Sequence, residues 1–113
     1  MKIYIAGPYS AKTKRERLQN AIRAVKAGLI AFKKGHYFFI PHLFHWADQY
    51  ARIMGLEMAW QDWMKWDSAW LVECDALLYL APSKGADIEL NTAKELGLKI
   101  YYSIDDVPDV DRT

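Results

Sequence analysis

Short apolar runs alternate along this chain with longer stretches in which apolar residues return every three or four positions. Continuous apolar runs of this kind, ended by Gly, Pro or polar residues, are typical of buried strands. Four such runs occur, and in chain order they read KIYIAG, HYFFIP, CDALLYLAP and KIYYS. The sequence therefore predicts four short strands.

The stretch between the first two runs has a helical period. Apolar side chains spaced by three and four positions predict a long helix over residues 14–34, and Gly35 is placed to end it. The stripe expected to face the core consists of Leu18, Ala21, Ile22, Val25, Leu29 and Phe32. Two more helices, separated at Gly55, are predicted between residues 42 and 73, and another over residues 86–96.

Strands and helices in this order form a parallel sheet with helices on both faces. We therefore expect an α/β fold: a single-domain, doubly wound parallel sheet of the Rossmann or flavodoxin type. The expected strand order is 2-1-3-4, with room for a short fifth strand. All 113 residues, 1–113, are expected to form this one domain. The acidic, proline-containing tail over residues 104–113 is expected to be loose or to lie across a neighbour.

Composition limits the classes of function. The chain is 52% hydrophobic and 26% charged with a net charge of +1, so bulk electrostatics favour neither nucleic acid nor a membrane. The cluster Lys12, Lys14, Arg15 and Arg17 is interpreted as a solvated helix start, with phosphate binding as the alternative. Cys74 is the only cysteine, which fits a reducing compartment and buried packing. No run is long enough for a signal peptide or a membrane span, so we expect a cytoplasmic protein.

Three loops are expected to meet at the carboxyl ends of the strands, where ligands bind in sheets of this type. They read GPYSAK, PHLFH and PSKGADIE. Tyr9 and Ser10 in the first loop are candidate contacts to a sugar or a phosphate, and His42 in the second is placed to touch a ligand. His42 and His45 do not form a metal site without a third ligand, so neither a metal nor a cofactor is expected.

The stretch SKGADIELNTA places a single carboxylate, Glu89, six residues after Ser83 and four after Gly85. The spacing predicts that Glu89 lies on the opening turn of a helix, just beyond a strand. Peptide dipoles at a helix start would keep this carboxylate anionic. Ser83, Gly85 and the neighbouring backbone N–H groups would suit a phosphate. Helix capping by Ser83 uses the same groups and is the alternative, and an ordinary first-turn glutamate is the alternative for Glu89.

The segments KIYIAGPYS, WDSAWLVECDALLYLAPSKGADIE and AKELGLKI resemble the nucleoside 2-deoxyribosyltransferase superfamily. The chain is most similar to its branch of 5'-monophosphate N-glycosidases. The resemblance implies that Glu89 is the nucleophile and that Tyr4 hydrogen-bonds to it. It implies that Gly7 lets the backbone approach the sugar. It also implies that Asp67, eight residues before Asp75, is a functional acid.

The residue six positions before the nucleophile separates branches of that superfamily. In this superfamily, enzymes that act on free nucleosides have an aspartate at this position, whereas the monophosphate-cleaving branch has a serine. An aspartate there would repel the phosphate of a monophosphate. Ser83 therefore favours a 5'-monophosphate. Asn91 departs from the family pattern, because a small residue usually stands there, where a helix packs closely against the sheet or a second subunit.

Four tryptophans fall on one side of the predicted helix that carries Asp67. They are Trp60, Trp63, Trp66 and Trp70. A small domain cannot easily bury four indoles alone, so we expect this stripe to form a homo-oligomer interface, most simply a homodimer. At most one of the four is expected to line the pocket for the base.

The resemblance and the residues together predict cleavage of the N-glycosidic bond of a (deoxy)nucleoside 5'-monophosphate, by hydrolysis or base exchange. Glu89 would meet the anomeric carbon either by attack or electrostatically, and Asp67 would relay a proton to the base. The alternative for Asp67 is an aspartate that faces solvent on its helix, and the alternative for Tyr4 is a tyrosine that only fills the core. The alternative functions are a non-catalytic nucleotide sensor and a glycohydrolase acting on NAD, although no G-x-G-x-x-G occurs.

Overall fold

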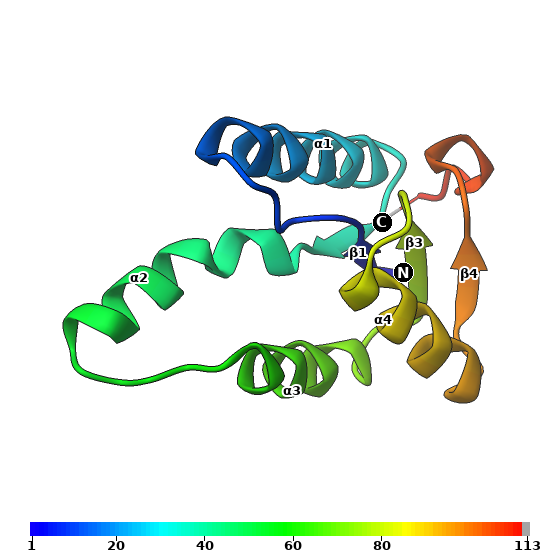
Figure 1. Ribbon diagram of the computed structural model, residues 1–113. Helices are drawn as coiled ribbons and strands as arrows, with labels where there is room; N and C mark the ends of the chain where they lie inside the picture. Colours follow the sequence, from blue (N-terminus) through cyan, green and yellow to red (C-terminus); the bar gives the residue numbers. More distant parts are fainter. Residues whose placement is uncertain (112–113) are drawn as a thin grey trace.

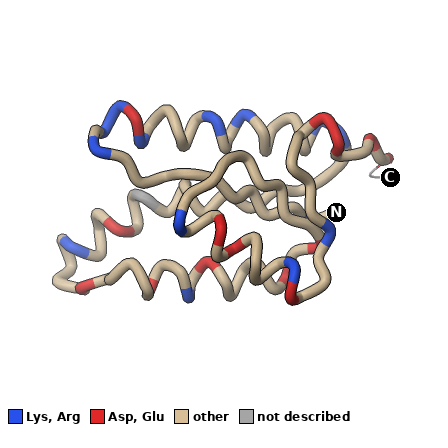
Figure 2. The backbone as a smooth tube through the Cα atoms, turned by 45° about the vertical axis from the view of Figure 1, so that its right-hand side comes forward, with Lys and Arg blue, Asp and Glu red and all other residues tan. Residues whose placement is uncertain are grey.

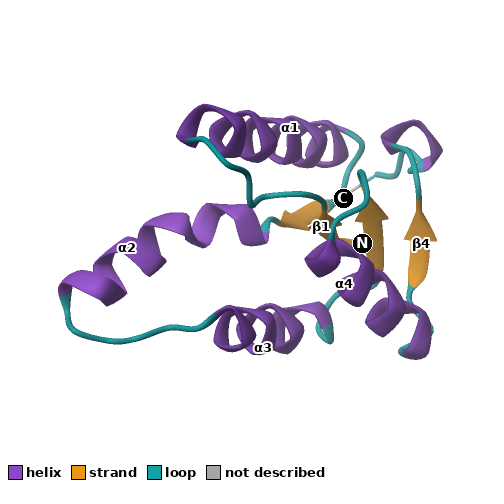
Figure 3. Ribbon diagram, in the orientation of Figure 1, coloured by secondary structure: helices purple, strands orange, loops and turns teal. Residues whose placement is uncertain are grey.

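The computed structural model of the chain describes residues 1–111, with the exception of the side chain of His45. Its centre is a four-stranded sheet (Figures 1 and 3). The strands are β1 (Lys2–Ala6), β2 (Tyr37–Phe39), β3 (Ala76–Tyr79) and β4 (Lys99–Tyr101). All neighbouring pairs are parallel and the order is β2-β1-β3-β4, which confirms the predicted topology. No fifth strand occurs within residues 1–111.

Helices cover both faces of the sheet. Figure 1 shows α1 (Lys14–Lys33) on one face, with α3 (Trp60–Leu71) and α4 (Lys84–Glu95) on the other. A short 3-10 helix, η1 (Pro41–Phe44), leads into α2 (His45–Ile53), which extends away from the sheet. Gly55 has φ +78° between α2 and α3, a backbone conformation that favours glycine, so the predicted break between these helices is confirmed.

The pleat of β1 divides its side chains between two cores. Ile3 and Ile5 point into the layer beneath α1 and are fully buried there. Tyr4 and Ala6 point into the opposite layer, beneath α3 and α4. Since successive strand residues face opposite sides of a sheet, each layer receives half of the strand. The central strand is therefore surrounded by protein on both faces.

The predicted core face of α1 is wrong for most of its large side chains, although Val25 does pack against the buried cluster. The helix buries Ala24, Ala27, Gly28 and Ala31 instead. Leu18 is 61% exposed and Leu29 is 55% exposed. The reason is close packing on the sheet, because a Cβ added to Gly28 would lie 2.9 Å from the ring of Phe38. Small residues allow this approach, and the large apolar side chains are displaced toward the outer surface.

The tail is ordered against the rest of the chain through residue 111, so the expectation of a loose tail is wrong there. A short 3-10 helix, η2 (Ile104–Asp106), follows β4, and Val107 is buried. The Val110 N–H donates to the Lys34 carbonyl at 2.7 Å, and the Lys34 amine donates to the Val107 carbonyl at 2.9 Å. The last two predicted tail residues lie outside the described part. Within that part, no helix is both long and apolar enough to cross a membrane.

Candidate active site

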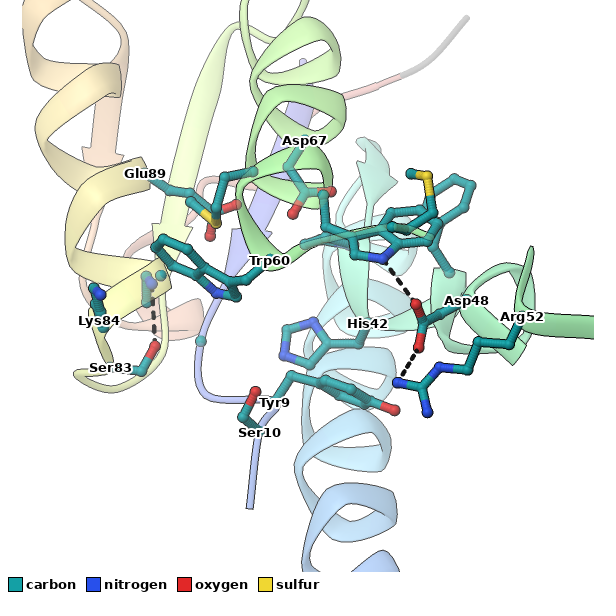
Figure 4. Close-up of a pocket in the computed structure, with 18 residues that line it drawn as sticks. Tyr9, Ser10, His42, Asp48, Arg52, Trp60, Asp67, Ser83, Lys84 and Glu89 are labelled. Atoms are coloured by element: carbon teal, nitrogen blue, oxygen red, sulfur yellow. Dashed lines mark hydrogen bonds and ion pairs between the residues drawn. The ribbon is translucent and has the colours of Figure 1, made fainter. Parts of the chain in front are cut away.

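One pocket of about 570 Å³ opens at the carboxyl ends of β1 and β3 (Figure 4). The three loops predicted to converge there all contribute to its lining. The predicted site residues that line it are Gly7, Tyr9, Ser10, His42, Asp67, Ser83, Gly85 and Glu89. Tyr4 lies beneath the pocket and reaches it through Glu89. The volume is in the range of pockets that hold small molecules.

Glu89 lies at the floor of the pocket and is only 5% exposed. α4 begins at Lys84, two residues earlier than predicted, so Glu89 lies in the second turn and the expected first-turn position is wrong. The cause is Ser83, whose hydroxyl accepts a hydrogen bond from the Ala86 N–H at 3.0 Å and caps the helix. The buried hydroxyl of Tyr4 donates to Oε2 of Glu89.

Burial dominates the protonation of the two acids. It raises the pKa of Glu89 to about 8, and the hydrogen bond from Tyr4 lowers that pKa only in part. The charge of Asp67 makes a smaller contribution to this raised value. Burial also raises the pKa of Asp67 to about 7. The expectation that helix dipoles keep Glu89 anionic is therefore wrong, because desolvation outweighs them. The coupled pair gains and loses protons close to neutral pH.

Tyr4 stays protonated as a hydrogen-bond donor. Burial raises the pKa of its hydroxyl far above the ordinary value, and the negative charges of Glu89 and Asp67 act in the same direction. Its ring stacks on Phe39 of β2, with centroids 5.5 Å apart. Packing and charge therefore hold the hydroxyl proton where it meets the Glu89 carboxylate.

The start of α4 forms one side of the pocket. The first N–H groups of a helix have no partner inside the helix, and here those of Lys84 and Gly85 belong to residues that line the pocket. A Cβ on Gly85 would meet only the sulfur of Met64, at 3.7 Å, so packing does not require the glycine. The Lys84 amine lies 4.6 Å from the ring centre of Trp60. This end of the pocket is suited to an anion.

His42 positions the first loop. It is buried, and its Nε2 lies 3.0 Å from the Pro8 carbonyl. Burial lowers its pKa, so the ring is neutral at physiological pH. Its Nδ1 is buried without a partner among the described residues, and the ring meets Tyr9 edge-on. Gly7 approaches β3 closely, because a Cβ there would lie 3.2 Å from Cβ of Leu80.

Further walls of the pocket come from α2 and from α3, which packs beside α4. Trp63 donates from its indole N–H to Asp48 at 3.0 Å, and Asp48 pairs with Arg52 at 3.2 Å. Trp60 lines the pocket together with Trp63, so the expectation of at most one tryptophan is wrong. Trp66 and Trp70 turn away from it and pack on Phe44 and Phe39 respectively.

Several predicted features lie away from the pocket. Asp75 caps the sheet, where it accepts a hydrogen bond from the Lys2 N–H at 2.8 Å. Cys74 is buried and its pKa is raised to about 11 by burial, which fits a packing residue. Asn91 is exposed, so it does not pack against the sheet. The basic cluster at the start of α1 (Figure 2) is solvated, with Arg17 donating to the Ala11 carbonyl.

The sequence interpretation missed three polar pocket residues. Lys84 was detectable, because it directly follows Ser83 at a helix start. Asp48 and Arg52 had no signal beyond a spacing of four residues on a helix, which usually indicates a surface ion pair. Among the described residues no group of three His, Cys, Asp or Glu side chains could hold a metal ion. The side chain of His45, considered above with His42, lies outside the described part.

Fold and site define an α/β protein with a doubly wound parallel sheet. Its pocket contains the carboxyl groups of Glu89 and Asp67 and lies between β1 and β3, where the strand order reverses. Residues 1–102 match the model of a family described as a domain of unknown function (DUF4406), and the chain belongs to that family. No curated protein matches the chain.

Proposed function

We propose that the protein cleaves the N-glycosidic bond of a nucleoside 5'-monophosphate. The observation that carries this proposal is the buried Glu89, which accepts the Tyr4 hydroxyl and shares its pocket with Asp67. Burying a carboxylate destabilises a small fold, and a second acid nearby adds to that cost. The resemblance of the sequence to the nucleoside 2-deoxyribosyltransferase superfamily, in its 5'-monophosphate N-glycosidase branch, supports the same assignment.

The nucleotide binds with its phosphate at the start of α4. Ser83 stands at the helix start, Lys84 supplies a cation, and Gly85 leaves its backbone open to the ligand. All three can bind the same anion. A 5'-monophosphate bound there places its sugar beside Glu89, which lies one turn further along the same helix. Lys84 stabilises the phosphate charge, whereas a free nucleoside lacks the group that this end of the pocket recognises.

The ionised carboxylate of Glu89 attacks the anomeric carbon of the sugar. The bond from that carbon to the base nitrogen breaks, and its electron pair goes to the base. The Tyr4 hydroxyl orients the attacking carboxylate and favours its charged form. The product of this step is a glycosyl ester of Glu89 and a departing base.

Asp67 supplies the proton that the departing base needs. Catalysis uses the form of the pair in which Asp67 is protonated and Glu89 is ionised, with the Tyr4 hydrogen bond favouring the ionised Glu89. Because the pKa is about 7 for Asp67 and about 8 for Glu89, this form is the minor singly protonated form at neutral pH. The Asp67 carboxylate then takes a proton from water, which attacks the ester, releases the sugar 5-phosphate and restores Glu89. Attack by a second base in place of water gives base exchange, so hydrolysis and transfer share the first step.

Chromatographic detection of free base from a panel of ribo- and deoxyribonucleotides tests this function. We expect release from 5'-monophosphates and a loss of about 10²–10³-fold or more in Glu89→Gln, which keeps the shape and removes the charge. Asp106→Asn, an exposed acid outside the pocket, is the matched control and should be unchanged. Base release by Glu89→Gln at the control rate contradicts the mechanism.

The same panel tests the role of Ser83. Free nucleosides should be poorer substrates than their monophosphates, and Ser83→Asp should weaken use of the monophosphates through charge repulsion. Faster turnover of nucleosides by the unmodified protein, at equal concentration, contradicts the phosphate assignment.

We also propose that the active protein is a homo-oligomer. Trp66 and Trp70 remain 42% and 48% exposed, and α2 presents Trp46, Tyr50 and Ile53 to solvent on one face. Apolar faces of this kind are commonly covered by a partner. Light scattering should give a molecular mass that is a multiple of 13.1 kDa, and Trp70→Glu should lower the measured mass. A fully active protein of single-chain mass at micromolar concentration refutes the proposal.

A further inference from the structure

The end of the pocket opposite the start of α4 carries a second polar group. Figure 4 shows Ser83 and Lys84 on one side, Asp48 and Arg52 on the other, and Glu89 and Asp67 between them. The mechanism proposed above uses the first side and the centre only. Asp48 and Arg52 therefore have no role in the bond-breaking step.

Asp48 is held in one orientation. One of its oxygens accepts the Trp63 indole N–H at 3.0 Å, and the other pairs with Arg52 at 3.2 Å. The Asp48 side chain is 27% exposed and the Arg52 side chain is 79% exposed. An ion pair this exposed adds little to stability. The ion pair by itself therefore gives little structural reason for a carboxylate at this place in the pocket.

The two charges at this end cancel, so it is unsuited to a phosphate. It instead offers a row of hydrogen-bonding groups: the acceptor oxygens of Asp48 followed by the N–H donors of Arg52. Each carboxylate oxygen has a second lone pair, and the guanidinium has five N–H groups, so both can bind a ligand while paired. Trp63 lies beside Asp48, and Met58 also lines the pocket.

In the binding mode proposed above, with the phosphate at α4 and the sugar at Glu89, the base of the nucleotide extends toward Asp48 and Arg52 on the other side of the pocket. Guanine presents two adjacent N–H donors, the ring N1–H and the 2-amino group, followed by the carbonyl at C6. Adenine and cytosine present a donor beside an acceptor, and uracil and thymine present one donor between two carbonyls. Only guanine among these bases matches two acceptors followed by a donor.

We infer that Asp48 and Arg52 read the base and select guanine nucleotides. Asp48 accepts from N1–H and the 2-amino group, Arg52 donates to the C6 carbonyl, and Trp63 fixes Asp48 for this purpose. This inference rests on the proposed function for the direction in which the nucleotide lies. Asp48, Arg52 and Trp63 are specificity-determining residues and take no part in the transfer of the sugar.

Calorimetric binding to the Glu89→Gln variant tests the inference, because the nucleotides then stay intact. The probes are guanosine, inosine and adenosine 5'-monophosphates and their 2'-deoxy forms. Hypoxanthine differs from guanine only by lacking the 2-amino group, so this pair isolates the contact to Asp48. We expect guanine nucleotides to bind about 10-fold more tightly than hypoxanthine nucleotides.

Two pocket variants separate the two contacts. Asp48→Asn keeps an oxygen for the Trp63 indole but loses a charge and an acceptor, so the preference for guanine over hypoxanthine should fall to about 2-fold. Arg52→Gln should weaken the binding of guanine and hypoxanthine nucleotides equally, because both bases have the C6 carbonyl, and should leave that preference intact. Asp106→Asn and Arg15→Gln, both exposed and outside the pocket, are matched controls and should change neither quantity.

The outcomes also distinguish this inference from the catalytic proposal. If guanine is preferred and Asp48→Asn removes the preference, the inference stands even when the wild-type protein releases no base. If bases are released but guanine and hypoxanthine nucleotides bind equally, the inference is overturned while the catalytic proposal stands. An unchanged preference in Asp48→Asn overturns the assignment of Asp48.

Discussion

The two faces of the central sheet are built on opposite principles. Beneath α1, β1 buries Ile3 and Ile5 against small helical residues in an apolar cluster. Beneath α4, the same strand buries Tyr4 against a carboxylate, Glu89. The first layer therefore stabilises the fold by close packing, and the second gives up stability to keep a buried acid at the floor of the pocket. A small protein that bears this cost on one face depends on the packing of the other.

The first way to sharpen this comparison is to damage the apolar layer beneath α1. Ile5→Ala should lower the free energy of unfolding by about 2–5 kcal/mol, because it leaves a cavity under α1, and Ile5→Val should lower it by about 0.5–1.5 kcal/mol. Urea denaturation measures both values, provided that the dependence of the free energy of unfolding on urea concentration is the same as in the wild type. The folded fraction of each variant should keep the wild-type dependence of turnover on pH, and a shifted profile would show that the layers are not independent.

The second test concerns the stability cost of Glu89. Its pKa is raised from 4.5 to about 8, so the folded state holds this proton more tightly than the unfolded state. As pH rises between these values, the unfolded state ionises first and the free energy of unfolding falls, by at most about 1.4 kcal/mol per pH unit. Below pH 4.5 the cost disappears.

Glu89→Gln cannot ionise and should therefore match the wild type near pH 4 and exceed its stability increasingly toward pH 8. Thermal unfolding of both proteins across this range measures the difference. Asp106→Asn, which removes an exposed acid far from the pocket, should show a difference that hardly depends on pH. A gain in Glu89→Gln that is the same at every pH would mean that Glu89 is not desolvated.

The third and smallest effect concerns the hydroxyl of Tyr4. Its hydrogen bond lowers the pKa of Glu89 against the effect of burial, so Tyr4→Phe should raise that pKa. The acidic limb of the pH–rate profile should move to higher pH by about one unit. Tyr79→Phe is a matched control, because Tyr79 donates to Asp87 at 2.6 Å outside the pocket. Equal profiles for Tyr4→Phe and the wild type would exclude the positioning role.

The elements and the convergence of three loops were predictable, because apolar runs and their period record which segments are buried. The geometry around Glu89 was predictable only in part. Its partner Tyr4 came from the family resemblance, since a tyrosine in a strand is ordinarily a core residue. Asp48 and Arg52 could not be found, because an acid and an arginine four residues apart on a helix normally face solvent.

The sequence by itself determined the breaks at Gly35 and Gly55 and the position of Ser83 and Glu89 after a strand, because these follow from local period and turn chemistry. It also determined the strand order, because alternating strands and helices form a doubly wound parallel sheet. Tertiary structure alone decided which side of α1 is buried, because an apolar stripe does not reveal that Gly28 must approach Phe38. It also decided that Glu89 has a raised pKa. Desolvation depends on every group that packs around the carboxyl, and those groups come from segments far apart in the chain.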